Sequence, residues 1–136
     1  SIPFILQFND ESILFSADSH PDTLVRSISR IYKNKKLKLK YMQIPHHGSR
    51  YNISNSLLKI IDCKDYIISA DGFNRSNLPN KETFVKVLHA NPHKIINFHI
   101  TQKNELTQNI FKVDKDSQVN LKFPDQGKDH LHFTIG

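Results

Sequence analysis

Hydrophobic residues recur along this chain at two different spacings, and the two alternate in a way that predicts an α/β fold. Short apolar runs, some with polar residues at every second position, predict strands at residues 2–8, 12–16, 37–44, 66–68, 95–98, 119–123 and 131–135. Apolar residues three and four positions apart predict helices at residues 20–32, 54–61 and 80–91. A polar turn at residues 9–11 joins the first two strands as a hairpin. Strand and helix then alternate, which implies helices packed on a mixed, largely buried sheet.

Residues at the helix ends agree with these boundaries. Pro21 is favoured in a first helical turn, and Asp22 complements the positive end of the helix dipole. Ser54 and Asn80 belong to the residue types whose side chains cap a helix N-terminus. His20 lies next to the first helix, where capping or solvent exposure is favoured over metal binding.

Length and composition limit the classes of protein. The chain has 136 residues, enough for one domain with one core, and no linker interrupts residues 1–100. The single Cys63 excludes an internal disulfide and a cysteine-based zinc site, and we expect it to be buried. No apolar run reaches the ~20 residues of a membrane-spanning helix, and we expect a cytoplasmic protein. A start without Met or a signal-peptide pattern leads us to expect a processed product or an excised fragment.

The charge favours anionic partners. The formal net charge is +6, which suits nucleic acid or phosphorylated substrates. Five lysines lie between residues 33 and 40, where they could follow a phosphate backbone. A solvated basic surface explains the same charges, and the scarcity of neighbouring aromatic residues argues against base stacking.

Two apolar strands end in residues suited to metal binding. Asp18 follows the second predicted strand, and His46 and His47 follow the strand that ends at Ile44. In α/β sheets, ligands collect where strands end. Carboxylate and imidazole groups bind Zn²⁺ and related ions. Taken alone, Asp18 is better explained as an N-terminal helix cap.

Three segments together resemble a known family. They read FSAD at residues 15–18, IPHHGS at 44–49 and IISADG at 67–72. Their order and spacing over residues 12–98 resemble the C-terminal half of the metallo-β-lactamase-fold hydrolases, in particular the branch with ComEC-like hydrolase domains. In that branch one strand ends in Gly-Asp, a later one in Pro-His-His-Gly-Ser, and a third in Ile-Ser followed by a small residue.

The resemblance implies a role for each matching residue. Asp18 matches the carboxylate that bridges two metal ions, and His46 is favoured over His47 as the last metal-binding histidine because it lies nearest the strand end. His47 would then take part in catalysis beside the metal, and Ser49 and Arg50 would contact the substrate. The family's cofactor is a pair of ions, Zn²⁺ or Mn²⁺, which activate a water and polarise the ester. The ComEC-like branch implies a phosphodiester substrate.

The chain departs from the family in three respects. The principal ligand motif, His-x-His-x-Asp-His, is absent from it. Ala17 stands where the family has Gly before the aspartate, which narrows the backbone freedom. Leu78 stands in a loop where the family carries a His-Pro pair, and leucine can neither donate a proton nor bind an anion.

The sequence therefore predicts one C-terminal half-domain of an αββα metallo-β-lactamase-like sandwich over residues 1–136. Residues 1–100 carry the resemblance to the core, and residues 101–136 form a polar, β-rich tail. An N-terminal half, on the same gene product or on a separate chain, would supply the other ligands and cover an apolar sheet face. We expect the isolated chain to bind metal weakly and to be inactive.

Two other functions fit the same sequence. A non-catalytic interaction module with this fold is supported by Leu78. A basic nucleic-acid-binding domain is supported by the net charge. An oligomer is compatible with each of the three.

Overall fold

The computed structural model describes residues 3–17, 19–33, 35–44, 50–69, 80–101 and 118–124. Six strands within them form one mixed sheet: β1 (Phe4–Phe8), β2 (Glu11–Phe15), β4 (Tyr41–Gln43), β6 (Asp65–Ile68), β7 (Ile96–Ile100) and β8 (Val119–Lys122). A second, small sheet consists of β3 (Leu37–Lys38) and β5 (Ile61–Asp62). The helices are α1 (Pro21–Tyr32), α2 (Asn55–Lys59) and α3 (Lys81–Ala90), with a 3₁₀ turn, η2 (Arg50–Asn52). The predicted α/β class is confirmed.

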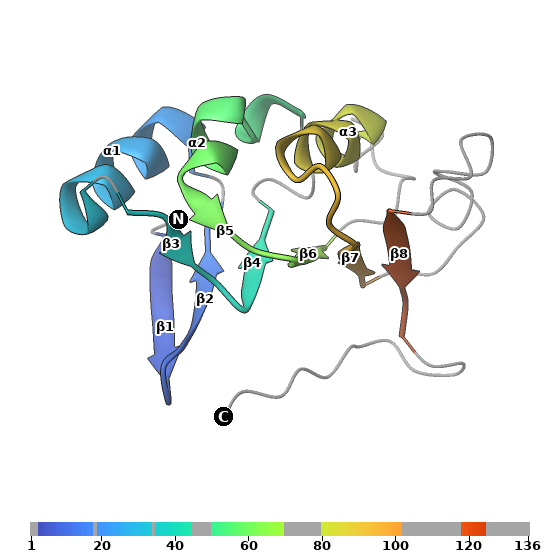
Figure 1. Cartoon of the computed structure of the whole chain (residues 1–136), viewed down its shortest axis with the longest axis horizontal. Helices are drawn as coiled ribbons and strands as arrows, with labels where there is room; N and C mark the ends of the chain where they lie inside the picture. Colours follow the sequence, from blue (N-terminus) through green and yellow to red (C-terminus); the bar gives the residue numbers. More distant parts are fainter. Residues whose placement is uncertain are drawn as a thin grey trace.

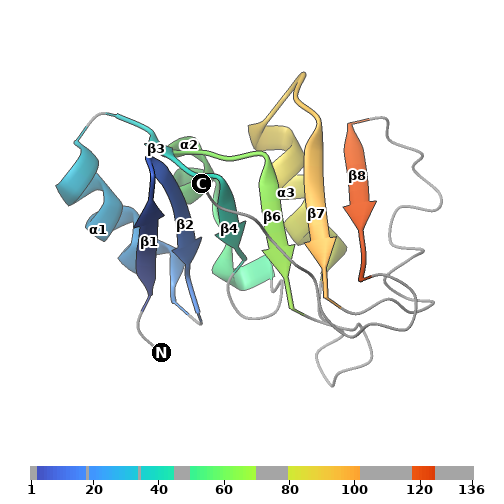
Figure 2. The ribbon, with the colours of Figure 1, turned by 90° about the horizontal axis from the view of Figure 1, so that it is seen from below.

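The strand order of the large sheet is β1-β2-β4-β6-β7-β8. β1 is antiparallel to β2, and every other pair of neighbours is parallel. Figure 2 shows β2, β4, β6 and β7 pointing the same way. Their C-terminal ends therefore meet along one side of the sheet, the carboxyl edge, and their N-terminal ends along the opposite side, the amino edge.

The β1–β2 hairpin follows from its turn residues. Asn9 and Asp10 have φ angles of 48° and 67°. Positive φ at both central residues is what a two-residue type I′ turn requires, and Asn and Asp tolerate it better than most residues. The register, with Phe8 opposite Glu11, leaves these two residues as the loop. The predicted hairpin is confirmed.

All three helices lie on one face of the sheet (Figure 1). The core fills the space between them, with Met42 and Phe98 from the sheet and Leu24 and Phe84 from the helices all buried. The rings of Phe84 and Phe98 meet edge to face, with centroids 4.7 Å apart. None of the helices in the described ranges is long and apolar enough to cross a membrane.

Cys63 lies in the same core, as predicted. Its thiol donates to the carbonyl oxygen of Asp65, at 3.2 Å. Burial raises the pKa of the thiol to about 12. The side chain is therefore a neutral thiol at physiological pH and a poor nucleophile.

The opposite face of the large sheet carries no helix from the described segments (Figure 2). Phe4, Leu6 and Phe8 of β1 point to this open face and have exposed fractions of 56%, 47% and 56%. Ile5 alternates with them and packs against the core beneath the helices. One end of the open face is therefore an exposed apolar surface.

The single strand predicted at residues 37–44 is wrong, because the chain changes sheets within it. Leu37 and Leu39 turn into the core with β5, and the amide of Leu39 donates to the carbonyl of Asp62 at 2.9 Å. The amide of Lys40 then donates to the carbonyl of Ser12 in the large sheet, at 2.8 Å. The alternating pattern continues across this break, so periodicity could not reveal it.

The helix predicted at residues 54–61 ends earlier in the structure than the spacing of its apolar residues suggests. The hydroxyl of Ser54 caps α2 as predicted, accepting from the amide of Leu57 at 3.1 Å. Ile61 is buried as expected, but it belongs to β5 rather than to the helix. Shortly after α2 ends, the chain therefore pairs with β3 as a strand and does not continue the helix.

Candidate functional site

The parallel strands bring the motif-bearing segments to the carboxyl edge. β2 leads to Ala17 and Ser19, β4 leads to Ile44, and β6 leads to Ser69. In the register of the sheet, Phe15 lies beside Gln43, and Gln43 lies beside Ile67. The three segments thus leave neighbouring strands at the same height.

The predictions for Asp18, His46, His47 and Ser49 concern positions outside the described residues, as does the one for Leu78. Arg50 is the one predicted site residue that the structure describes. Among the described residues, no three His, Cys, Asp or Glu side chains gather in a group that could hold a metal ion. A metal site at this edge would therefore depend on Asp18 and the histidine pair.

Hydrogen bonds between described residues join the loops on either side of these positions. The hydroxyl of Ser16 donates to the carbonyl of Gln43, and so ties the end of β2 to the end of β4. The side-chain amide of Asn52 donates to the carbonyl of Ser19 at 3.2 Å. The amide of Ile44 donates to the carbonyl of Ile67 at 2.9 Å. The residues flanking Asp18 and those flanking the His-His-Gly-Ser run are thus linked.

Ala17, directly before Asp18, has a φ angle of 51°. This is the left-handed region, where the Cβ of any residue other than Gly approaches the backbone and costs about 1–2 kcal/mol. The family pattern that this segment resembles has Gly at this position. The local backbone is therefore of the kind that favours Gly, although the chain carries Ala.

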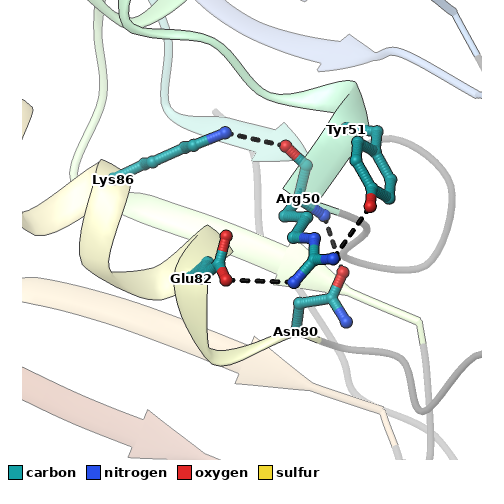
Figure 3. Close-up of polar contacts among 5 residues, drawn as sticks. All are labelled: Arg50, Tyr51, Asn80, Glu82 and Lys86. Carbon is teal, nitrogen blue, oxygen red and sulfur yellow. Dashed lines mark hydrogen bonds and ion pairs between the residues drawn. The ribbon is translucent and has the colours of Figure 1, made fainter.

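Arg50 is held from several sides at the start of η2 (Figure 3). Its Nη1 donates to Glu82 Oε1 at 3.0 Å, and its Nη2 donates to Tyr51 Oη at 2.8 Å. Its guanidinium also lies over the Tyr51 ring, 4.9 Å from the centroid. The hydrogen bond to Tyr51 and the charge of Glu82 raise the pKa of Arg50, so the group is a permanent cation.

The backbone of Arg50 is fixed by α3. Its amide donates to Asn80 Oδ1 at 2.8 Å, and its carbonyl accepts from Lys86 Nζ at 2.8 Å (Figure 3). Lys86 donates a second bond, to the carbonyl of Ile53 at 3.2 Å. The residue that follows the His-His-Gly-Ser run is therefore anchored to the helix that follows the third motif segment.

Asn80 corrects a detail of the sequence prediction. It occupies the N-cap position of α3 as predicted, but its side chain makes no capping hydrogen bond. The carbonyl oxygen that would have capped the helix accepts from Arg50 instead. The Asn80 oxygen thus bonds to a residue distant in sequence and not to its own helix. No pattern in the neighbouring sequence indicates this.

The guanidinium of Arg50 was predicted to face a substrate anion, and in the structure it carries an ion pair. The side chains of Arg50 and Glu82 are 41% and 63% exposed. Exposed pairs are weak and screened by salt, so a phosphate oxygen could replace the carboxylate. No sequence pattern indicated Glu82 as a partner of Arg50, since an acidic residue is common in the first turn of a helix.

His20 and His99 have structural partners. His20 is the N-cap of α1, and its Nδ1 accepts from the amide of Asp22 at 3.3 Å, which confirms the capping role. His99 lies on the open face, with Nε2 2.9 Å from Asp65 Oδ1. The Tyr41 ring meets His99 edge to face at 5.8 Å, and burial raises the pKa of Tyr41, with the charge of Asp65 adding to the effect. The sequence did not anticipate this cluster.

Comparison with known proteins assigns no family to this chain. No family model, no curated protein and no solved structure matches it. The functional interpretation therefore depends on the motif residues and on the arrangement of the segments around them.

Replacing Asn80 tests how Arg50 is positioned. Asn80→Ala should expose the amide of Arg50 to hydrogen exchange and lower the free energy of unfolding by about 1 kcal/mol, because one hydrogen bond is lost. Asn80→Asp keeps an acceptor oxygen at the same place and should retain the protection. Exchange measured by NMR and urea unfolding provide the two readouts. Equal protection in both variants would mean that the bond does not hold Arg50.

Replacing Ala17 tests the backbone next to Asp18. Ala17→Gly should raise the free energy of unfolding by about 1 kcal/mol, since relief of the left-handed conformation exceeds the entropy that Gly adds to the unfolded chain. Ala90→Gly at the end of α3 is the matched control and should be destabilising. Urea unfolding measures both. If Ala17→Gly instead lowered the free energy of unfolding, the backbone at Ala17 would not be strained.

Proposed function

We propose that this chain is one half of a metal-dependent phosphodiester hydrolase with the metallo-β-lactamase fold. The observation that carries the proposal is the shared carboxyl edge of β2, β4 and β6. Each of the three motif segments follows or ends one of these adjacent parallel strands. A site that draws ligands from separate loops needs this arrangement.

The donor set suits a hard or borderline divalent cation. Asp18 would supply a carboxylate and His46 an imidazole, the ligand types that Zn²⁺ and Mn²⁺ accept. The bound ions would lower the pKa of a water and polarise the phosphodiester. His47 would transfer a proton next to the bound ions, and Ser49 and Arg50 would bind the phosphate oxygens. Arg50 is suited to this because its cation is permanent and its ion pair with Glu82 is exposed to solvent.

The backbone at Ala17 supports the same assignment. The resemblance placed Gly directly before the metal-bridging aspartate, and the φ angle of Ala17 is in the region that Gly prefers. The motif match and the backbone angle are separate observations on the same residue. Their agreement favours a turn that presents Asp18 as the family presents its carboxylate.

The open face supports the idea of a second half. Sheets with mostly parallel strands are normally covered on both faces. Here the described helices cover one face, and Phe4, Leu6 and Phe8 expose apolar side chains on the other. In an αββα sandwich a second sheet would bury this face. That partner, carrying a His-x-His-x-Asp-His motif, would also complete the ligand set.

One observation favours a non-catalytic module of the same fold. Arg50 is engaged by Glu82 and Tyr51 rather than free for an anion, and Leu78 replaces the family's histidine. A chain that had lost catalysis would retain the packing of Arg50 without needing its charge for a substrate. The activity measurement separates the two functions.

Hydrolysis of bis(p-nitrophenyl) phosphate with added Zn²⁺ or Mn²⁺ tests the proposal. The isolated chain should be inactive, and the chain joined to a segment with the His-x-His-x-Asp-His motif should turn over. Asp18→Ala should then reduce turnover by more than about a hundredfold, since even outer partners of metal ligands contribute about 10–100-fold. Asp22→Ala, in the first turn of α1, is the matched control.

Two outcomes would contradict this account. Full turnover by the isolated chain, lost in Asp18→Ala, would show that no second half is needed. Absence of turnover from the joined protein, with metal bound, would favour the non-catalytic module.

A further inference from the structure

A basic recess lies between the ends of α1 and α2. It has a volume of about 590 Å³, within the range of about 300–1,000 Å³ typical of small-molecule sites. Four exposed lysines line it, and Ile28 and Ile60 provide apolar surface. The lysines are Lys33, Lys35, Lys36 and Lys59. We refer to this cavity as the lysine recess.

The lysine recess is separate from the carboxyl edge. α1 begins near the carboxyl edge, after β2, and ends before β3, so residues 33–36 lie toward the amino edge. β3 ends at Lys38, shortly before β4 begins at Tyr41, and so lies toward the amino edge. The recess therefore lies toward the opposite edge of the sheet from Ser19 and Arg50, and its ligand is a different question from the substrate of the proposed hydrolase.

The fold holds the lysines together although they come from distant parts of the sequence. Leu37 pairs with Ile61 in the small sheet, and the amide of Leu37 donates to the carbonyl of Ile60 at 2.8 Å. These contacts fix the segment with Lys35 and Lys36 against the end of α2, where Lys59 lies. Pairing of β3 with β5 thus brings Lys35 and Lys36 to the same recess as Lys59.

No described carboxylate forms an ion pair with any of the four lysines. The acidic side chains of neighbouring strands are paired elsewhere: Asp62 is 3.4 Å from Lys94, and Glu11 is 3.0 Å from Lys40. The ammonium groups around the recess therefore repel one another, and a bound anion would relieve that repulsion.

The ends of two helices do not account for this charge. A helix C-terminus carries about −0.5 elementary charge, and α2, with five residues, has less than a full macrodipole. Two helix ends therefore offset at most about one of the four lysine charges, and a net charge of about +3 is left. The four lysines therefore carry more positive charge than is needed to balance the two helix dipoles.

We propose that the lysine recess binds a compact anion with two or more phosphate groups. Lysines recognise phosphate as point charges, and a concave site with four of them suits several phosphates close together. No aromatic ring from the described residues lines the recess, so nothing there stacks a nucleic-acid base. A duplex backbone is convex and would reach only the rim.

Isothermal titration of the 136-residue chain with inorganic tripolyphosphate tests the proposal. Low salt preserves the charge attraction, and EDTA keeps divalent metal out of the carboxyl edge, so the result does not depend on the proposed hydrolase site. Lys35→Gln and Lys59→Gln should each weaken binding about fivefold, and the double variant about 25-fold. Orthophosphate should bind at least about tenfold more weakly, because one phosphate reaches fewer ammonium groups.

Lys122→Gln is the matched control, because it removes the same charge from β8 at the far end of the sheet (Figure 1). It should change affinity by less than about twofold. Equal weakening by Lys122→Gln and Lys59→Gln would overturn the proposal in favour of diffuse charge. Tighter binding of a DNA duplex than of tripolyphosphate, with the same dependence on Lys35 and Lys59, would overturn it in favour of a nucleic-acid surface. Absence of tripolyphosphate binding at low salt would also overturn it.

Discussion

Parallel pairing of β2, β4, β6 and β7 is the constraint on which the rest of this structure depends. Parallel neighbours need crossover connections, so all segments that follow strands leave at the carboxyl edge and all segments that precede them arrive at the amino edge. The two edges differ in chemistry. The described residues that flank Asp18 and the His-His-Gly-Ser run lie at the carboxyl edge, and the lysine recess lies toward the amino edge.

The described helices cover only one face of the sheet. Burial of Met42, Phe84 and Phe98 gives the helix side a close-packed core. On the open face, Asp65 accepts hydrogen bonds from Asn97 and contacts His99, so its polar side chains are satisfied within the sheet. The β1 end of that face has apolar side chains instead, and covering it would give a partner a hydrophobic contribution to binding.

Local signals predicted the local parts of the fold. The polar turn at residues 9–11, the Pro21 helix start and the Ser54 cap each act within a few residues, and each is found. Contacts between distant residues could not be predicted in the same way. The pairing of β3 with β5 breaks a continuous alternating pattern, and Asn80 gives its capping oxygen to Arg50, 30 positions away. Motif spacing predicts that Asp18 and the histidine pair meet at the carboxyl edge, which stays a prediction, but it did not indicate the Glu82 and Tyr51 partners of Arg50.

The central claim is that the carboxyl edge gathers a metal site around Asp18. Paramagnetic Mn²⁺ broadens the NMR signals of nearby amides, so it tests this directly. The account predicts weak binding that broadens Ser19, Ile44 and Arg50 together, with loss of the effect in Asp18→Ala and retention in Asp22→Ala. Broadening that persists in Asp18→Ala, or that is centred on Asp65 and His99, would contradict it.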